Sequence, residues 1–210
     1  MENPYQQRLI DTLTDKDNLS LVKKEAAEFY QGHTIHECYD MAMELYKSDY
    51  FQLQEIGVLL CGYIGSEQPK AFNFLKETVS LNPSWKVQEV LAMAFDSYCK
   101  NTGYEKAIPV IEDWLRDKNE NVRRAVSEGL RIWTSRPYFK ENPQKAIDLL
   151  AVHRDDESEY FRKSVGNALR DISKKYPELI KKELESWDTS SKRTMQVYQL
   201  AGKFIFTKSI

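Results

Sequence analysis

Cysteine, glycine and proline are scarce in this sequence, with three, eight and seven of them among 210 residues. Cys38, Cys61 and Cys99 lie in apolar segments and form no Cys-x-x-Cys pair, so we expect buried thiols and neither a disulfide framework nor a zinc ribbon. Low glycine and proline exclude collagen-like and low-complexity chains. No stretch approaches the ~20 apolar residues of a membrane span, so we expect no membrane partner.

The chain also lacks an excess of either charge. Lys and Arg number 30 against 32 Asp and Glu, for a formal net charge of −2, so the total does not indicate nucleic acid, although one face can still be basic. The start, Met1-Glu2-Asn3-Pro4-Tyr5, has neither a basic nor an apolar signal region, and we expect a cytoplasmic protein. A phosphate-cradling glycine loop and a nucleophile motif are also missing.

What the sequence does contain is an internal repeat. In five segments, an apolar residue is followed by two polar residues in most cases, with small residues such as Ala94, Gly129 and Ala168 at the eighth place. This spacing places the small residues on one helical stripe, where neighbouring helices can approach closely. The separations of 34, 35, 39 and 33 residues are near those of helix-pair solenoids. The segments start at Leu53, Val87, Val122, Phe161 and Thr194.

The repeat predicts an all-α fold, an α-α superhelix of HEAT-like repeats with a concave groove. Further helices are expected at 107–115 and 146–150, with breaks at the Asn-Pro pairs 82–83 and 142–143 and an N-cap in the cluster 189–191. Alternation of period two, which strands require, is absent. We predict one domain over residues 1–210, with 1–50 as an atypical N-terminal helical cap and 51–210 as repeated helix pairs.

Equivalent positions of successive repeats should border the groove. Three carboxylates there, Glu89, Glu128 and Asp171, stand among arginines, a combination that could stabilise a developing positive charge and hold phosphates. The alternative is that these charges form ion pairs between repeats, which are common in a chain of 30% charged residues. The residues expected beside these carboxylates on the groove are Trp85, Arg123, Arg124, Arg131, Lys163, Asn167 and Arg170.

Two other groups of residues have plainer interpretations. The segment from His33 to Cys38 contains side chains that can bind metal, but no second cluster accompanies it, and a turn with surface histidines is favoured. Trp133, Tyr138 and Phe139 could form a platform for a base, although aromatic residues at helix ends usually pack in the core, which we favour.

The segments VRRAVSEGLR (122–131) and EYFRKSVGNALRDISKKYP (159–177) resemble those of bacterial DNA alkylation repair proteins with HEAT-like repeats, the AlkC and AlkD group. The resemblance covers roughly residues 50–210. It implies a DNA glycosylase that binds duplex DNA as a monomer, with the seven groove residues named above as the DNA-binding candidates. Such an enzyme cleaves the N-glycosidic bond of cationic purines such as 3-methyladenine or 7-methylguanine, without metal or cofactor.

The resemblance also implies roles for single residues. Trp85 and Glu89 match the AlkD tryptophan and catalytic aspartate, while Arg124 and Arg170 match its DNA-contacting arginines. A second AlkD tryptophan falls on Asn167. Glu89, Glu128 and Asp171 all have counterparts in AlkC, whose RP-x-LPW continuation is replaced here by residues 131–137.

Two functions therefore stay open. The carboxylate trio favours a glycosylase. The asparagine at 167, the weak match of residues 1–50 and the absence of net positive charge favour a noncatalytic paralogue that binds DNA weakly or serves as a protein-binding scaffold.

Overall fold

The computed structural model describes residues 4–14 and 17–206, and all of their regular structure is helical, as predicted. No helix in these ranges is both long and apolar enough to cross a membrane. The chain forms two compact units, residues 1–102 and 103–210, which are described separately. The α-helices of the first unit are α1 (Pro4–Leu13), α2 (Leu19–Gly32), α3 (Ile35–Leu45), α4 (Phe51–Ile64), α5 (Pro69–Glu77) and α6 (Trp85–Thr102). Those of the second are α7 (Ile108–Leu115), α8 (Glu120–Gly129), α9 (Pro137–Glu141), α10 (Pro143–Ala151), α11 (Glu159–Ser173), α12 (Pro177–Glu185) and α13 (Lys192–Ala201).

The repeat register predicted from the sequence is confirmed. Each of the five segments begins at the third residue of a helix, in α4, α6, α8, α11 and α13 respectively. The expected intervening helices are present as α7 and α10, and α1, α2 and α3 make the first 50 residues helical. One continuous domain with a groove along it stays a prediction.

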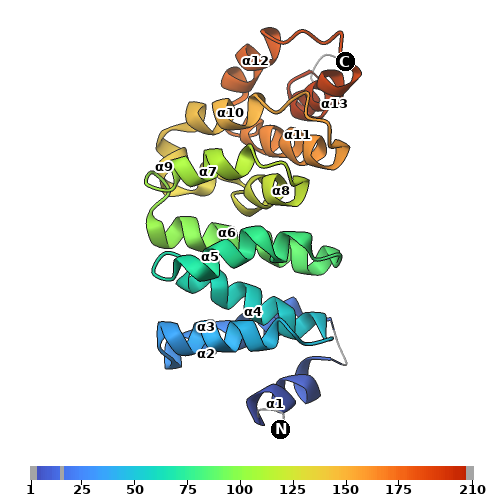
Figure 1. The fold of residues 1–210 in the computed structure, drawn as a ribbon. Coiled ribbons are helices and arrows are strands. Elements are labelled where there is room, and N and C mark those ends of the chain that lie inside the picture. Colours follow the sequence, from blue (N-terminus) through green and yellow to red (C-terminus); the bar gives the residue numbers. More distant parts are fainter. Residues whose placement is uncertain (1–3, 15–16, 207–210) are drawn as a thin grey trace. The chain divides into compact units, whose positions relative to one another are not determined.

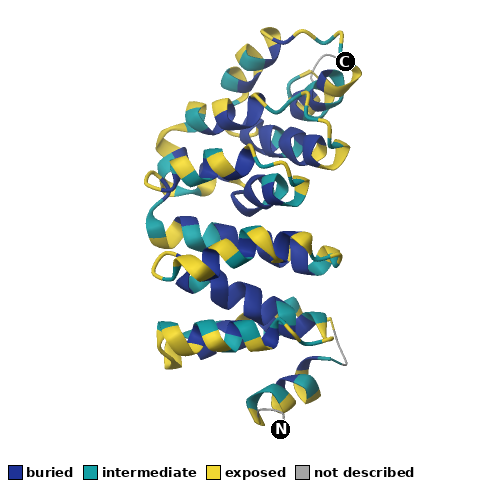
Figure 2. Ribbon diagram, viewed as in Figure 1, coloured by how far each residue is buried: buried dark blue, intermediate teal, exposed yellow. Residues whose placement is uncertain are grey.

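In the first unit, α4 is the central helix. It packs against α2, α3, α5 and α6, and its residues are almost all buried (Figures 1 and 2). Even its polar residues Gln52 and Glu55 are buried, with 5% and 4% of their surface exposed. At Gly62 the backbones of α4 and α6 touch, because an added Cβ would lie 2.5 Å from the Cα of Ala94. The first unit therefore depends on a helix that neighbours cover on several sides.

In the second unit, α11 has the same central position, packed against α8, α10, α12 and α13 (Figure 1). Its buried apolar residues follow helical spacing, from Phe161 and Val165 to Leu169 and Ile172. Trp133 and Phe139 are fully buried with ring centroids 5.0 Å apart, which confirms the packing interpretation for these two rings.

Side-chain caps define several helix starts. Ser191 caps α13, which confirms the expected N-cap cluster. Thr34 and Glu37 form a capping box at the start of α3. In that segment the ring of His33 stacks on the ring of Phe29, with centroids 3.8 Å apart. Among the described residues, no group of three or more His, Cys, Asp or Glu is placed to hold a metal.

Two arginines, Arg123 and Arg162, hold the loops before α8 and α11 in the same way. Arg123 donates to the carbonyl oxygens six and five residues earlier, at 2.7 and 3.1 Å. Arg162 repeats this pattern with the oxygens of Asp156 and Glu157, at 2.7 and 3.0 Å. We call Arg123 and Arg162 the loop arginines. The loop arginines stand second in their repeat segments, so this position of the repeat serves to fix the preceding loop.

Gly62→Ala should lower the free energy of unfolding by about 1–3 kcal/mol, because the new methyl group would collide with the backbone of α6. Gly32→Ala is the matched control. Nothing lies within 4 Å of its added Cβ at the end of α2, so stability should stay the same or rise slightly. Urea unfolding of both variants measures the difference, and equal stabilities would contradict the packing of α4 on α6.

Candidate functional site

Trp85 and Glu89 lie one turn apart at the start of α6. Hydrogen bonds fix this helix start, since the Gln88 side-chain amide donates to the carbonyl oxygens of Val79 and Asn82, at 2.9 and 2.8 Å. Trp85 is 65% exposed. Glu89 is exposed and makes no hydrogen bond or ion pair with any residue that the structure describes. The pair therefore offers an exposed indole and, among the described residues, an unpaired carboxylate on one face of a helix.

Lys86 lies between these two residues in sequence. Its ammonium group pairs with the carboxylate of Asp17 at 2.5 Å and lies 4.2 Å from the ring centroid of Phe51. It is also 5.8 Å from the ring centroid of Trp85. The charge of Lys86 is thus already balanced by Asp17 and by aromatic rings.

Glu55 on α4 is the buried carboxyl of this region. It makes no hydrogen bond or ion pair within the described ranges. Burial, together with the carboxylates of Asp17 and Glu89 and against the opposing charge of Lys86, raises the pKa of Glu55 to about 7. Glu55 therefore exchanges its proton near neutral pH.

The other two predicted carboxylates belong to the second unit, where they bind one arginine. Arg131 donates from Nε to Asp171 at 2.7 Å and from a terminal nitrogen to Glu128 at 3.4 Å. Lys174 donates to the other oxygen of Asp171 at 2.9 Å, and Ser164 donates to the other oxygen of Glu128 at 2.7 Å. Every oxygen of these two carboxylates therefore has a partner.

The ionisation of Asp171 reflects this pairing. Its burial, to 7% exposed, by itself favours the neutral acid and raises the pKa. The hydrogen bonds and charges of Lys174 and Arg131 outweigh burial, so the pKa of Asp171 lies below its ordinary value. Asp171 is an anion held by two cations, and it ties α11 to the residues that follow α8.

Arg124 and Arg170 differ from the other predicted arginines. The guanidinium of Arg124 lies over the ring of Tyr160, 4.0 Å from its centroid. Arg170 is half-buried, and its Nε is shielded from solvent without an acceptor. Within the described part of the chain, neither forms an ion pair with a carboxylate. Both keep charge available for an external anion.

The remaining predicted DNA contacts are engaged or neutral. Arg123 is a loop arginine and also pairs with Asp156 at 2.8 Å, with only 11% of its side chain exposed. Lys163 pairs with Glu159 at 2.7 Å on the surface, and Asn167 is half-buried. The DNA-binding roles of these residues stay predictions.

Glu55 and Lys86 were not singled out in the sequence. The signal for Glu55 was present, since Leu53-Gln54-Glu55 and Val87-Gln88-Glu89 occupy equivalent places in adjacent repeats. No pattern in the sequence indicates that Lys86 reaches Asp17, which lies 69 residues away.

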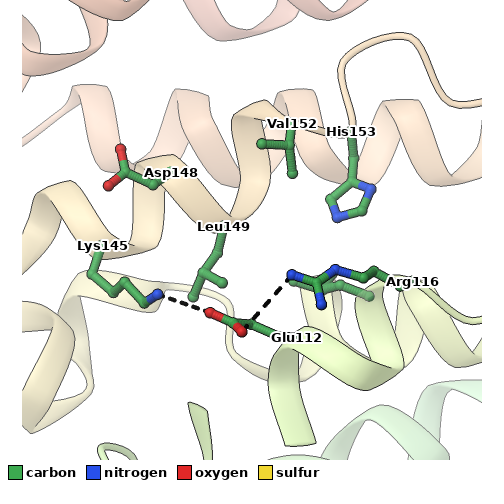
Figure 3. Close-up of a pocket in the computed structure, with 8 residues that line it drawn as sticks. Glu112, Arg116, Lys145, Asp148, Leu149, Val152 and His153 are labelled. Atoms are coloured by element: carbon green, nitrogen blue, oxygen red, sulfur yellow. Dashed lines mark hydrogen bonds and ion pairs between the residues drawn. The ribbon is translucent and has the colours of Figure 1, made fainter. Parts of the chain in front are cut away.

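A pocket of about 150 Å³ lies between α7 and α10 of the second unit (Figure 3). Glu112 on its wall accepts from Lys145 at 2.9 Å and lies 3.9 Å from Arg116. Burial lowers the pKa of His153, which also lines the pocket. Its cations and anions thus largely neutralise one another, and none of its lining residues is a predicted site residue.

These observations define a helical repeat protein that carries carboxylates and arginines on equivalent helices. The chain belongs to the family described as DNA alkylation repair enzyme, whose sequence model matches residues 18–200.

Individual proteins of known structure or sequence are also similar to this chain. The structure of AlkD2 from Streptococcus mutans is 45% identical, with a TM-score of 0.92, and the match covers 96% of this chain and 99% of that one. Alkylpurine DNA glycosylase AlkC of Pseudomonas fluorescens, solved bound to DNA containing an abasic site analog, shares the fold at 22% identity and a TM-score of 0.51, over 71% of this chain and 42% of that one. The uncharacterized protein YhaZ of Bacillus subtilis (strain 168) is 38% identical over 108 residues, which are 50% of this chain and only 30% of YhaZ.

Asp171→Asn should lower the free energy of unfolding at neutral pH by about 1–3 kcal/mol, because the amide cannot replace an anion between two cations. The folded pKa is depressed, so this stability is present above the unfolded pKa and is lost as pH falls through the folded one. The difference from wild type should therefore shrink below about pH 4. Asp148→Asn, at an exposed residue bonded only to Gln144, is the control and should cost little at either pH. A pH-independent loss in Asp171→Asn would contradict the ion-pair argument.

Proposed function

We propose that this protein binds duplex DNA in alkylation repair and hydrolyses the N-glycosidic bond of cationic alkylated purines, with Glu89 as the catalytic carboxylate. The observation that carries the proposal is the pair Trp85 and Glu89. It combines an exposed indole with an exposed, unpaired carboxylate one turn later on α6. Membership of the DNA alkylation repair family supports it.

Cleavage of the bond to a cationic purine requires few catalytic groups from the protein. An alkylated purine that already carries a positive charge leaves as a neutral base, so no general acid is needed. The positive charge moves to the sugar, where a fixed carboxylate stabilises it and water then adds. Glu89 can meet this charge without first giving up another partner, and the face of Trp85 can attract the cation. Neither step requires a metal or a cofactor.

Phosphates are assigned to Arg124 and Arg170, because no carboxylate among the described residues pairs with either arginine. Lys163 can add to them by exchanging Glu159 for a phosphate oxygen on the surface. The DNA-bound state of AlkC supports DNA as the partner. The protein is proposed to act on DNA as a cytoplasmic monomer.

A specific observation also favours the second candidate, a noncatalytic paralogue that binds DNA or a protein. Glu128 and Asp171 have all their oxygens engaged by Arg131, Lys174 and Ser164. They act as structural anions in this arrangement. Excision thus depends on Glu89, and its removal separates the two functions.

Glu89→Gln should lower single-turnover release of 7-methylguanine from alkylated duplex DNA by about 10²-fold, because the amide cannot balance the charge of the transition state. DNA affinity and melting temperature should stay close to wild type. Glu77→Gln removes an exposed carboxylate of α5 in the same unit and should leave release unchanged. Wild-type protein that binds this DNA but releases no base leaves only the noncatalytic candidate.

The affinity for duplex DNA should fall steeply as salt rises, because each neutralised phosphate releases counterions. Replacing both Arg124 and Arg170 by Ala should reduce the slope of log affinity against log salt by about 2. A control for the loss of one surface charge is Arg116→Ala, whose side chain is 74% exposed beside Glu112. An equal dependence of log affinity on log salt in wild type, the double variant and the control would show that these two arginines do not contact DNA phosphates.

A further inference from the structure

We propose that Glu55 is the second carboxylate of the Trp85 and Glu89 site, and that its ionisation adds the negative charge needed to hold a positively charged sugar. This inference deepens the proposed function and rests on it for the substrate. It assigns to Glu55 a role in supplying charge, whereas Glu89 faces the reacting sugar.

The position of Glu55 follows from the repeat. Glu55 and Glu89 occupy the same place on two successive repeat helices, α4 and α6, and these helices pack together at Gly62 and Ala94. Glu89 is at the surface, whereas Glu55 is 96% buried, with 4% of its surface exposed. The same residue type at equivalent places thus has two different environments.

Glu55 lacks the partner that a buried carboxyl normally has. Other buried charges in the chain have one, such as Glu25, which accepts two hydrogen bonds from Arg8 at 2.7 and 3.2 Å. Glu55 makes no such bond with any described residue, so its carboxyl group depends on the small solvent contact that it keeps, and an ion in such a place is costly. A site that leaves a buried carboxyl unpaired is suited to a cation supplied from outside.

Three charged groups have the largest effects on the pKa of Glu55. From α6 these are Lys86 and Glu89, and from the segment before α2 it is Asp17. Because Lys86 already pairs with Asp17, the positive charge of Lys86 is largely balanced by that carboxylate. The balance leaves Glu55 and Glu89 as two carboxylates without a counterion.

Binding of a cation and loss of the Glu55 proton are therefore linked. With a pKa raised to about 7, Glu55 is mostly neutral in slightly acidic solution and mostly ionised above pH 7. A positive charge beside Glu89 lowers this pKa, so binding expels the proton, and by linkage the affinity for a cation rises with pH. Glu55 thereby makes the site selective for positive charge above neutral pH.

Two duplexes test this without any need for excision. One contains a pyrrolidine abasic analogue, whose secondary amine stays protonated up to about pH 8, and the other contains a neutral tetrahydrofuran analogue. In wild type, the preference for pyrrolidine over tetrahydrofuran DNA should rise about tenfold between about pH 6 and about pH 8. Glu55→Gln should remove this rise. Glu55→Asp keeps the carboxyl and should retain it.

A measurement on wild type alone covers the case in which Glu55→Gln does not fold. Calorimetry of pyrrolidine DNA binding in buffers of different ionisation enthalpy, near pH 6.5, should detect release of roughly half a proton or more beyond that seen with tetrahydrofuran DNA. An equal rise in Glu55→Gln, no charge preference in wild type, or no proton release would each overturn the role of Glu55. A linked preference without base release would instead overturn the proposed excision and leave Glu55 as part of a cation-selective DNA site.

Discussion

The central constraint in each unit is that a repeat helix is covered by neighbours on more than one side. A charge on α4 or α11 that turns toward a neighbour has little water to stabilise it, so it finds a partner within the protein or its ionisation becomes less favourable. Asp171 and Arg162 follow the first course, and Glu55 follows the second. The distinction between structural and available charges arises from this packing.

That distinction changes the significance of the three predicted carboxylates. As sequence they are alike, each on a repeat helix near arginines. In the structure, Glu128 and Asp171 are neutralised by Arg131 and its neighbours, while Glu89 at the exposed start of α6 is not. A carboxylate paired between repeats and an unpaired carboxylate thus occupy comparable helical positions and differ in the residues that lie beside them.

The fold could be predicted because each helix has its own local periodicity of apolar and small residues. A twelve-residue pattern located five helices. The Asn-Pro pairs and the cluster at 189–191 lie at or just before the starts of α6, α10 and α13. The charged partners could not be predicted in the same way, because they join distant positions: Arg131 reaches Asp171 forty residues later, and Ser164 reaches Glu128 thirty-six residues earlier. Which of several nearby arginines makes such a contact depends on side-chain direction. Repeat alignment nevertheless contained one unused clue, the match between Glu55 and Glu89.

The loop arginines have a consequence for how the second unit opens. Asp156 accepts from Arg123 through its side chain and from Arg162 through its carbonyl oxygen, so one residue joins the loop before α8 to the loop before α11. In repeat proteins, cooperativity is set by coupling between nearest neighbours, and a shared hydrogen-bonding residue strengthens that coupling. Fraying of α8 therefore also removes a contact that orders the start of α11. The two repeats are built to open and close together, as one cooperative element of the native-state fluctuations.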